Sequence, residues 1–169
     1  KIINAIFFYI IWWGCIFGIK YSYEYLGPLL AFICISLHLY LISQYKKEFK
    51  LILFCSILAL LVEGMHLHMG LISYRGYIYV NSLIPPLWII CIWISIGTTL
   101  NYSMFFLKER LFLMVLCGGI FGPLFYFIAT EIEIIYFYYS TETSLLLLSA
   151  VWGISLPSMC YINKQIYKT

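Results

Sequence analysis

Charged side chains are scarce in this sequence: Asp, Glu, Lys and Arg together make up 10% of it, against about 25% in an ordinary soluble domain. The chain also lacks a phosphate-binding glycine loop, a zinc-protease helix motif and a nucleophile elbow. Its net charge of +3 is small and dispersed, whereas nucleic-acid binding needs a concentrated basic patch. We therefore predict no nucleic-acid partner, no metal and no cofactor.

Apolar residues, in contrast, account for 64% of the 169 residues, and the mean hydropathy is +0.97. A chain this short cannot bury so much apolar surface in one aqueous core, because small domains leave a large share of their surface in water. The solvent for most of the molecule must then be lipid. The sequence predicts an integral membrane protein.

Six apolar segments are long enough to cross a bilayer, which takes about 17–25 residues in a helix. They cover residues 2–19, 26–43, 51–72, 83–105, 111–130 and 144–162. Their continuous hydrophobicity, without two-residue alternation, predicts helices rather than a barrel. No small-residue cleavage site follows the first segment, so we interpret it as a retained span. The predicted fold is an all-α membrane protein, a single domain over residues 1–169 built as a bundle of six transmembrane helices.

Proline, glycine and cysteine refine this picture. The second and fourth segments open with Pro28 and with Pro85-Pro86, which suits the first turn of a helix, while Pro123 and Pro157 predict kinks inside the last two. The glycines of residues 118–122 predict close helix packing. The six cysteines lie in apolar runs without a C-x-x-C pair, so we expect buried thiols and no disulfide.

Lys and Arg are distributed unevenly between the loops on the two predicted sides of the membrane. One side carries Lys1, Lys46, Lys47, Lys50, Lys108, Arg110, Lys164 and Lys168, and the other carries Lys20 and Arg75. Cytoplasmic loops are enriched in these residues, so we place both termini in the cytoplasm. The opposite side holds Glu24, Glu131, Glu133, Glu142 and the tyrosines Tyr21, Tyr23, Tyr25, Tyr74, Tyr77, Tyr79, Tyr136, Tyr138 and Tyr139. These tyrosines predict an interfacial belt or, alternatively, a cap over a cavity.

Glu63 is the acidic residue that lies deep in a predicted span, about 18 Å from the start of its segment at 1.5 Å per residue. Charged groups at such depth are costly and are candidates for function. His66 follows on the same helix face, but a di-metal site needs a second Glu-x-x-His pair, which is missing. Without a Lys or Arg in any span, we expect Glu63 to be neutral at pH 7 and to line an internal cavity. A hydrogen-bonding role and a proton-coupled or ligand-binding role both remain open.

His38 lies near the cytoplasmic end of the second span, at the depth that the fourth span reaches at Thr98, Thr99 and Asn101. These four side chains form a second predicted polar cluster, about 12 Å from Glu63 along the membrane normal. The two levels then mark one path through the bundle. Hydrogen bonding that merely joins helices is the alternative.

A distinctive signature runs through the chain. It consists of Pro85-Pro86-Leu87-Trp88, Trp93, Thr98-Thr99-Leu100-Asn101 and Gly122-Pro123-Leu124, with His38 upstream between two leucines. In this signature, in length and in number of spans, the chain resembles the bacterial membrane family named domain of unknown function 2878. The family commonly has His where this chain has Tyr102, and Asp where it has Glu63, so the carboxylate is kept and the histidine is not. The signature adds Trp88 to the candidate ligand-site residues.

The resemblance implies a multi-pass protein of the bacterial inner membrane, and it favours lipid handling because members of the family are associated with fatty-acyl modification. Membrane lipids are the expected partners, together with a membrane-protein partner. Two alternatives remain open: a small transporter or substrate-binding membrane subunit, and a structural or assembly subunit without a ligand. The sequence does not decide whether the protein is an enzyme.

Overall fold

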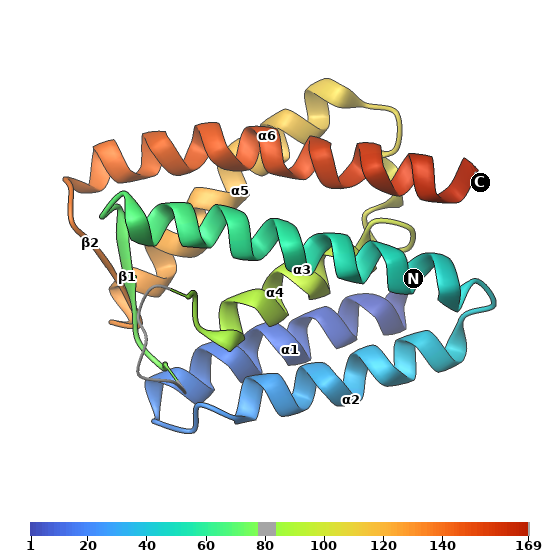
Figure 1. Cartoon of the computed structure of the whole chain (residues 1–169), viewed down its shortest axis with the longest axis horizontal. Coiled ribbons are helices and arrows are strands. Elements are labelled where there is room, and N and C mark those ends of the chain that lie inside the picture. The colour runs from blue at the N-terminus through green and yellow to red at the C-terminus, as the bar shows by residue number, and fades with distance from the viewer. Residues whose placement is uncertain (78–83, 169) are drawn as a thin grey trace.

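The computed structural model describes residues 1–77 and 84–168, and helices dominate it (Figure 1). In chain order the elements are α1 (Ile2–Lys20), α2 (Leu26–Leu41), α3 (Tyr45–His68), β1 (Ile72–Tyr74), α4 (Leu87–Thr99), the 3-10 turn η1 (Phe105–Leu107), α5 (Leu111–Glu131), β2 (Ile135–Phe137) and α6 (Thr141–Lys168). The helical fold predicted from the sequence is confirmed. Two three-residue strands are an addition to the all-α prediction.

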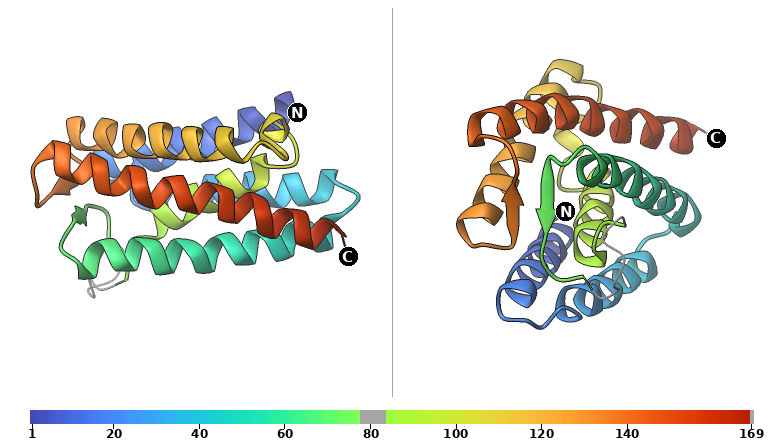
Figure 2. Two further views of the ribbon diagram at one scale, coloured as in Figure 1. Left: turned by 90° about the horizontal axis from the view of Figure 1, so that it is seen from above. Right: turned by 60° about the vertical axis from the view of Figure 1, so that its left-hand side comes forward.

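The long helices run up and down, and both chain ends lie at the same end of the bundle (Figure 1). We call this the terminal end, and the opposite end, where β1 and β2 lie, the capped end. Helix α4 occupies the centre, with the other helices arranged around it (Figure 2). Ten of its 13 residues are buried. A helix that is surrounded by protein can be shorter than the hydrocarbon core of the membrane, because its backbone ends do not meet lipid.

Four helices, α1, α3, α5 and α6, are long and apolar enough to cross a membrane, whereas α2 and α4 are shorter apolar helices. The fourth predicted segment, 83–105, was therefore too long: its helix covers Leu87–Thr99, and residue 83 lies outside the described residues. Pro86 precedes the first helical residue. Beyond Thr99 the chain turns through Asn101 and Ser103, whose polar side chains compete with helical hydrogen bonds.

Helix α3 begins six residues earlier than the sequence analysis placed it, at Tyr45 rather than at residue 51. The early start brings Lys46, Lys47 and Glu48 into the first turn of the helix. Hydropathy alone places these charged residues in a loop, because their side chains are polar. This correction changes the candidate site, since Glu48 is fully buried.

Helices α5 and α6 pack closely along the predicted glycine surface. A Cβ atom added at Gly118 would lie 2.3 Å from the Trp152 carbonyl oxygen, and one at Gly122 would lie 2.3 Å from the Trp152 ring. Pro123 lies inside the continuous helix α5. Its missing N–H releases the carbonyl of Gly119, which accepts a hydrogen bond of 2.7 Å from the Ser149 hydroxyl of α6. The close packing predicted for these glycines is confirmed.

The two strands form an antiparallel pair in which Ile72 faces Phe137 and Tyr74 faces Ile135. The pair joins the connection after α3 to the connection after α5, across the capped end of the bundle (Figure 1). Ile72 of β1 and Ile135 of β2 are buried. Tyr74 is also buried, so it does not belong to the predicted interfacial belt. Tyr79 of that predicted set lies outside the described residues.

Candidate functional site

One face of α3 carries a carboxylate near each of its ends. The buried residues of this helix follow one another at intervals of three or four, as Glu48, Leu51, Cys55, Ala59, Glu63 and His66. This spacing keeps them on a single stripe that faces the bundle interior. Glu48 lies toward the terminal end and Glu63 toward the capped end, and both side chains are inaccessible to solvent.

Four hydrogen-bonding groups converge on the carboxylate of Glu63. Its Oε1 accepts a hydrogen bond of 2.6 Å from Trp93 Nε1 and another from the Tyr126 hydroxyl. Its Oε2 accepts one from the Tyr74 hydroxyl and lies 3.1 Å from His66 Nδ1. The partners come from α3, α4, α5 and β1, so this one carboxylate joins four elements of the fold. We call these five residues the Glu63 cluster.

The Glu63 cluster satisfies both carboxylate oxygens. The spans hold no Lys or Arg to pair with Glu63, but Trp93 and Tyr126 of neighbouring helices donate hydrogen bonds to its carboxyl group. The neutrality of Glu63 at pH 7 stays a prediction. Glu63 is fully buried, and it lines none of three cavities found among the described residues, so the predicted internal cavity beside it is not among them. Burial and the adjacent Glu63 carboxylate raise the pKa of Tyr74 well above its ordinary value, so its hydroxyl remains a donor at neutral pH.

Two further tryptophans extend the Glu63 cluster. Trp88 donates a hydrogen bond of 2.9 Å to the Arg75 carbonyl, and its ring meets Tyr74 edge-on at 6.0 Å. Trp152 stacks on Trp93 at 4.3 Å between ring centroids. The structure thus places Trp88 beside Tyr74 of the Glu63 cluster, away from the signature residues His38 and Asn101 at the terminal end.

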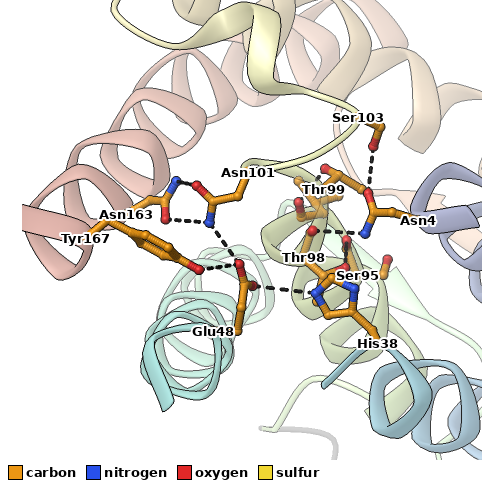
Figure 3. Close-up of polar contacts among 11 residues, drawn as sticks. Asn4, His38, Glu48, Ser95, Thr98, Thr99, Asn101, Ser103, Asn163 and Tyr167 are labelled. Carbon is orange, nitrogen blue, oxygen red and sulfur yellow. Dashed lines mark hydrogen bonds and ion pairs between the residues drawn. The ribbon is translucent and has the colours of Figure 1, made fainter. Parts of the chain in front are cut away.

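Glu48 is the centre of a second cluster, at the terminal end (Figure 3). Its Oε1 accepts hydrogen bonds from Asn101 Nδ2 at 2.9 Å and from the Tyr167 hydroxyl at 2.6 Å. Asn101 and Asn163 exchange two hydrogen bonds, at 2.9 and 2.8 Å. The Oε2 atom faces His38 Nε2 at 3.7 Å. We call these five residues the Glu48 cluster, and it joins α2, α3, α6 and the turn after α4.

The distance between Glu48 Oε2 and His38 Nε2 is short enough for an ion pair but too long for a hydrogen bond. Within the described part of the chain, neither His38 Nε2 nor Glu48 Oε2 has a hydrogen-bond partner, although both atoms are buried. The His38 ring lies edge-on to Tyr102 at 5.1 Å. Burial, followed by the negative charge of Glu48, raises the pKa of Tyr102 to about 12. Tyr102 therefore contributes a neutral hydroxyl beside the Glu48 carboxylate.

Thr98 and Thr99 do not join the Glu48 cluster through their hydroxyl groups. Each hydroxyl donates to a backbone carbonyl one turn earlier in α4. The backbone carbonyl of Thr98 accepts a hydrogen bond of 3.0 Å from Asn4 Nδ2, and Asn4 Oδ1 accepts one of 2.8 Å from Ser103 (Figure 3). Each threonine hydroxyl thus bonds within its own helix, whereas the other two residues of the predicted cluster, His38 and Asn101, meet at Glu48.

The Glu48 cluster borders the largest cavity described here, which has a volume of about 630 Å³ and which we call the terminal cavity. Asn101, Tyr102, Asn163 and Tyr167 contribute to its wall, beside apolar residues of α5, α6 and the turn after α4. Lys108, Lys164 and Lys168 also line it, together with Glu109, whose carboxylate lies 3.2 Å from Lys164 Nζ; the three lysines outnumber this one carboxylate. Ligand sites typically enclose about 300–1,000 Å³. The cavity therefore combines apolar walls, amide and hydroxyl groups and a positive rim.

Comparison with known protein families supports the resemblance seen in the sequence. A family model described as protein of unknown function (DUF2878) matches residues 1–158. The chain belongs to this family. No curated protein and no solved structure matches it. In this DUF2878 protein, the signature residues Trp88 and Trp93 surround Glu63, while Asn101 and His38 surround Glu48, so one sequence signature serves two clusters.

Sequence reasoning missed Glu48 and most of the side chains that bind the two carboxylates. A signal for Glu48 was present: stepping back from Glu63 by three or four residues leads through Ala59, Cys55 and Leu51 to Glu48. The partners Tyr126, Tyr74, Asn163 and Tyr167 carry no such signal, because distant helices bring them together. Within residues 1–77 and 84–168, no group of three or more His, Cys, Asp or Glu side chains is arranged to hold a metal ion.

Proposed function

We propose that this DUF2878 protein crosses the bacterial inner membrane six times with both termini in the cytoplasm. Support comes from the Lys and Arg bias between loops, since the residues counted as cytoplasmic belong to the segments at the terminal end. At 1.5 Å per residue, the 16 residues of α2 and the 13 of α4 extend about 24 and 20 Å, short of the roughly 30 Å of hydrocarbon. Residues 100–104, which follow α4, are buried or half-buried, and non-helical backbone at membrane depth is tolerated where protein surrounds it.

Cysteine-accessibility labelling in intact cells tests this topology. Single cysteines placed at residues 46–50 and 108–110 in a cysteine-free background should react only after the cells are permeabilised. A cysteine at residue 75 should react with an impermeant reagent from outside. Labelling of residue 75 from the cytoplasm alone would overturn the proposed orientation.

The function that we propose for the terminal cavity is binding an amphiphile with an anionic head group, as part of lipid handling. The observation that carries this proposal is the joint presence of apolar walls and three lysines around one cavity of about 630 Å³. Lysines at the cytoplasmic membrane surface attract anionic lipid head groups by about 1 kcal/mol each. At the same wall, Asn163 Nδ2 donates one hydrogen bond to Asn101 and has a second N–H that can bind a ligand.

Equilibrium binding of a fluorescent phosphatidylglycerol, with phosphatidylcholine as the neutral comparison, tests this assignment in detergent micelles. The double variant Lys108→Gln/Lys164→Gln should weaken phosphatidylglycerol binding by roughly tenfold or more. The matched control is Lys46→Gln/Lys50→Gln, which removes the same charge from exposed lysines at the terminal end that do not line the cavity.

Phosphatidylcholine binding should change little in either variant, because its head group has no net charge. Equal losses in the cavity variant and in the control would show general attraction to the basic surface and would contradict a specific site. Absence of any preference for phosphatidylglycerol would contradict the anionic head group.

A further inference from the structure

A second cavity, of about 250 Å³, lies between α1 and α5 and is nearly all apolar. Ala5 and Phe8 line it from α1, Cys117 and Phe121 from α5, and Trp152 from α6. We call it the lateral cleft. Its two polar residues from the α4 region are already committed: the Thr99 hydroxyl donates to Ile96 and the Ser103 hydroxyl donates to Asn4. Those hydroxyls therefore offer no donor to a ligand, so the lining favours a hydrocarbon.

The lateral cleft opens to the side of the bundle. Helices α1 and α5 flank it, and the rings of Trp12 and Phe125 meet between them, 5.5 Å apart. Tyr9 and Phe121 line the cleft and are 58% and 52% exposed. In a membrane this side of the molecule faces the acyl chains, so the opening admits a chain directly from the bilayer.

Met104 lies between the two cavities, because it lines both the lateral cleft and the terminal cavity. Its side chain is flexible, so an amphiphile with its charged head beside Lys108 and Lys164 reaches the cleft with its tail by displacing this one side chain. We infer that the lateral cleft binds the hydrocarbon chain of the same anionic amphiphile whose head group occupies the terminal cavity. This inference rests on the proposed function and specifies its ligand class: a lipid with an anionic head and a long acyl or isoprenoid chain.

Photo-crosslinking tests this assignment on the full-length chain. The probe is phosphatidylglycerol with a diazirine at the end of one acyl chain, diluted into phosphatidylcholine nanodiscs. Irradiation should attach the probe to peptides of α1 that contain residues 5–9 and of α5 that contain residues 117–125. Dominant attachment to the exposed face of α3, or crosslinks spread evenly over all lipid-facing helices, would overturn the inference.

Filling the lateral cleft provides the mutational test. Ala5→Phe and Cys117→Phe add a ring to opposite walls, and each should lower crosslinking to the cleft several-fold. Ala150→Phe, which adds the same ring at an exposed position of α6 outside the cleft, should leave crosslinking unchanged. Monodispersity and thermal unfolding check that each cleft variant folds. If one variant does not fold, the other still tests the inference.

The outcomes separate this inference from the proposed function. If Ala5→Phe and Cys117→Phe fold and crosslink like the wild type, the chain does not lie in the cleft, whatever the lysine variants do. If the lysine variants also keep full binding of phosphatidylglycerol, the proposed head-group site fails as well. If cleft crosslinking falls and the lysine variants reduce affinity, both assignments are supported.

Discussion

Replacing Glu63 tests whether its buried hydrogen bonds hold the bundle together. Glu63→Leu introduces an apolar side chain of comparable size and removes both acceptor oxygens. Trp93 Nε1 can only donate, and it then has no acceptor, while Tyr74, Tyr126 and His66 lose theirs. A buried donor without a partner costs about 1–3 kcal/mol. Because the two hydroxyls and the imidazole can partly rearrange, we expect a loss of roughly 4 kcal/mol in the free energy of unfolding.

Glu63→Gln should cost far less. Its carbonyl oxygen still accepts from Trp93 and Tyr126, and its amide can donate to the Tyr74 hydroxyl and to the other tautomer of His66. Neutral hydrogen bonds replace charge-assisted ones, so we expect a loss of about 1 kcal/mol. The large difference between the Leu and Gln variants is the expected signature.

The assay is unfolding in detergent by titration with sodium dodecyl sulfate, followed by tryptophan fluorescence, since Trp93 and Trp152 lie at the cluster. Glu131→Leu is the matched control, because it removes a carboxylate from an exposed position at the capped end. A Glu63→Leu protein as stable as wild type, or one no less stable than Glu63→Gln, would refute the role of these hydrogen bonds.

Three further predictions follow from the packing and charges. Gly122→Ala should lower the free energy of unfolding by about 1–3 kcal/mol because its methyl group overlaps the α6 tryptophan ring, whereas Gly64→Ala, with no atom within 4 Å of its added Cβ, should raise it by about 0.5–1 kcal/mol. Both are measured in the same titration. Since the pKa of Tyr102 is raised from 10.0 to about 12 in the folded state, the stability it contributes is complete below pH 10 and is lost as the pH rises toward 12; Tyr102→Phe should remove this part of the pH dependence, and an unchanged profile would contradict it. Asn163→Ala should destabilise by about 0.6–1.7 kcal/mol, the range of interhelical hydrogen bonds in membranes, with wild-type stability as the contradicting result.

The central helix α4 shows how far hydropathy alone can predict this fold. The existence of this helix and its start near Pro85-Pro86 were predictable, because apolar runs and proline have local effects. Its end at Thr99 was not, since the apolar residues beyond it, such as Met104 and Leu107, resemble those within the helix. Burial among other helices lets the chain turn there without meeting lipid.

The two carboxylates show the same division at the site. Glu63 was found from the sequence because a charge among apolar residues is conspicuous. Glu48 was overlooked because Lys46, Lys47 and Lys50 surround it in sequence, although only Glu48 turns inward. Glu48 differs from these lysines in the face of the helix on which it lies. An average of hydropathy over a window does not resolve which face a residue occupies.

The sequence by itself determined a membrane-type composition, the approximate helices, the glycine packing surface and the family, because each depends on neighbouring residues or on short motifs. Only the tertiary structure decided that Tyr74, Trp93 and Tyr126 surround Glu63 and that Asn101 and Tyr167 meet at Glu48. These partners lie between 11 and 119 residues from their carboxylates along the chain. Periodicity tells which face of a helix is buried, but the packing of whole helices decides which side chains meet there.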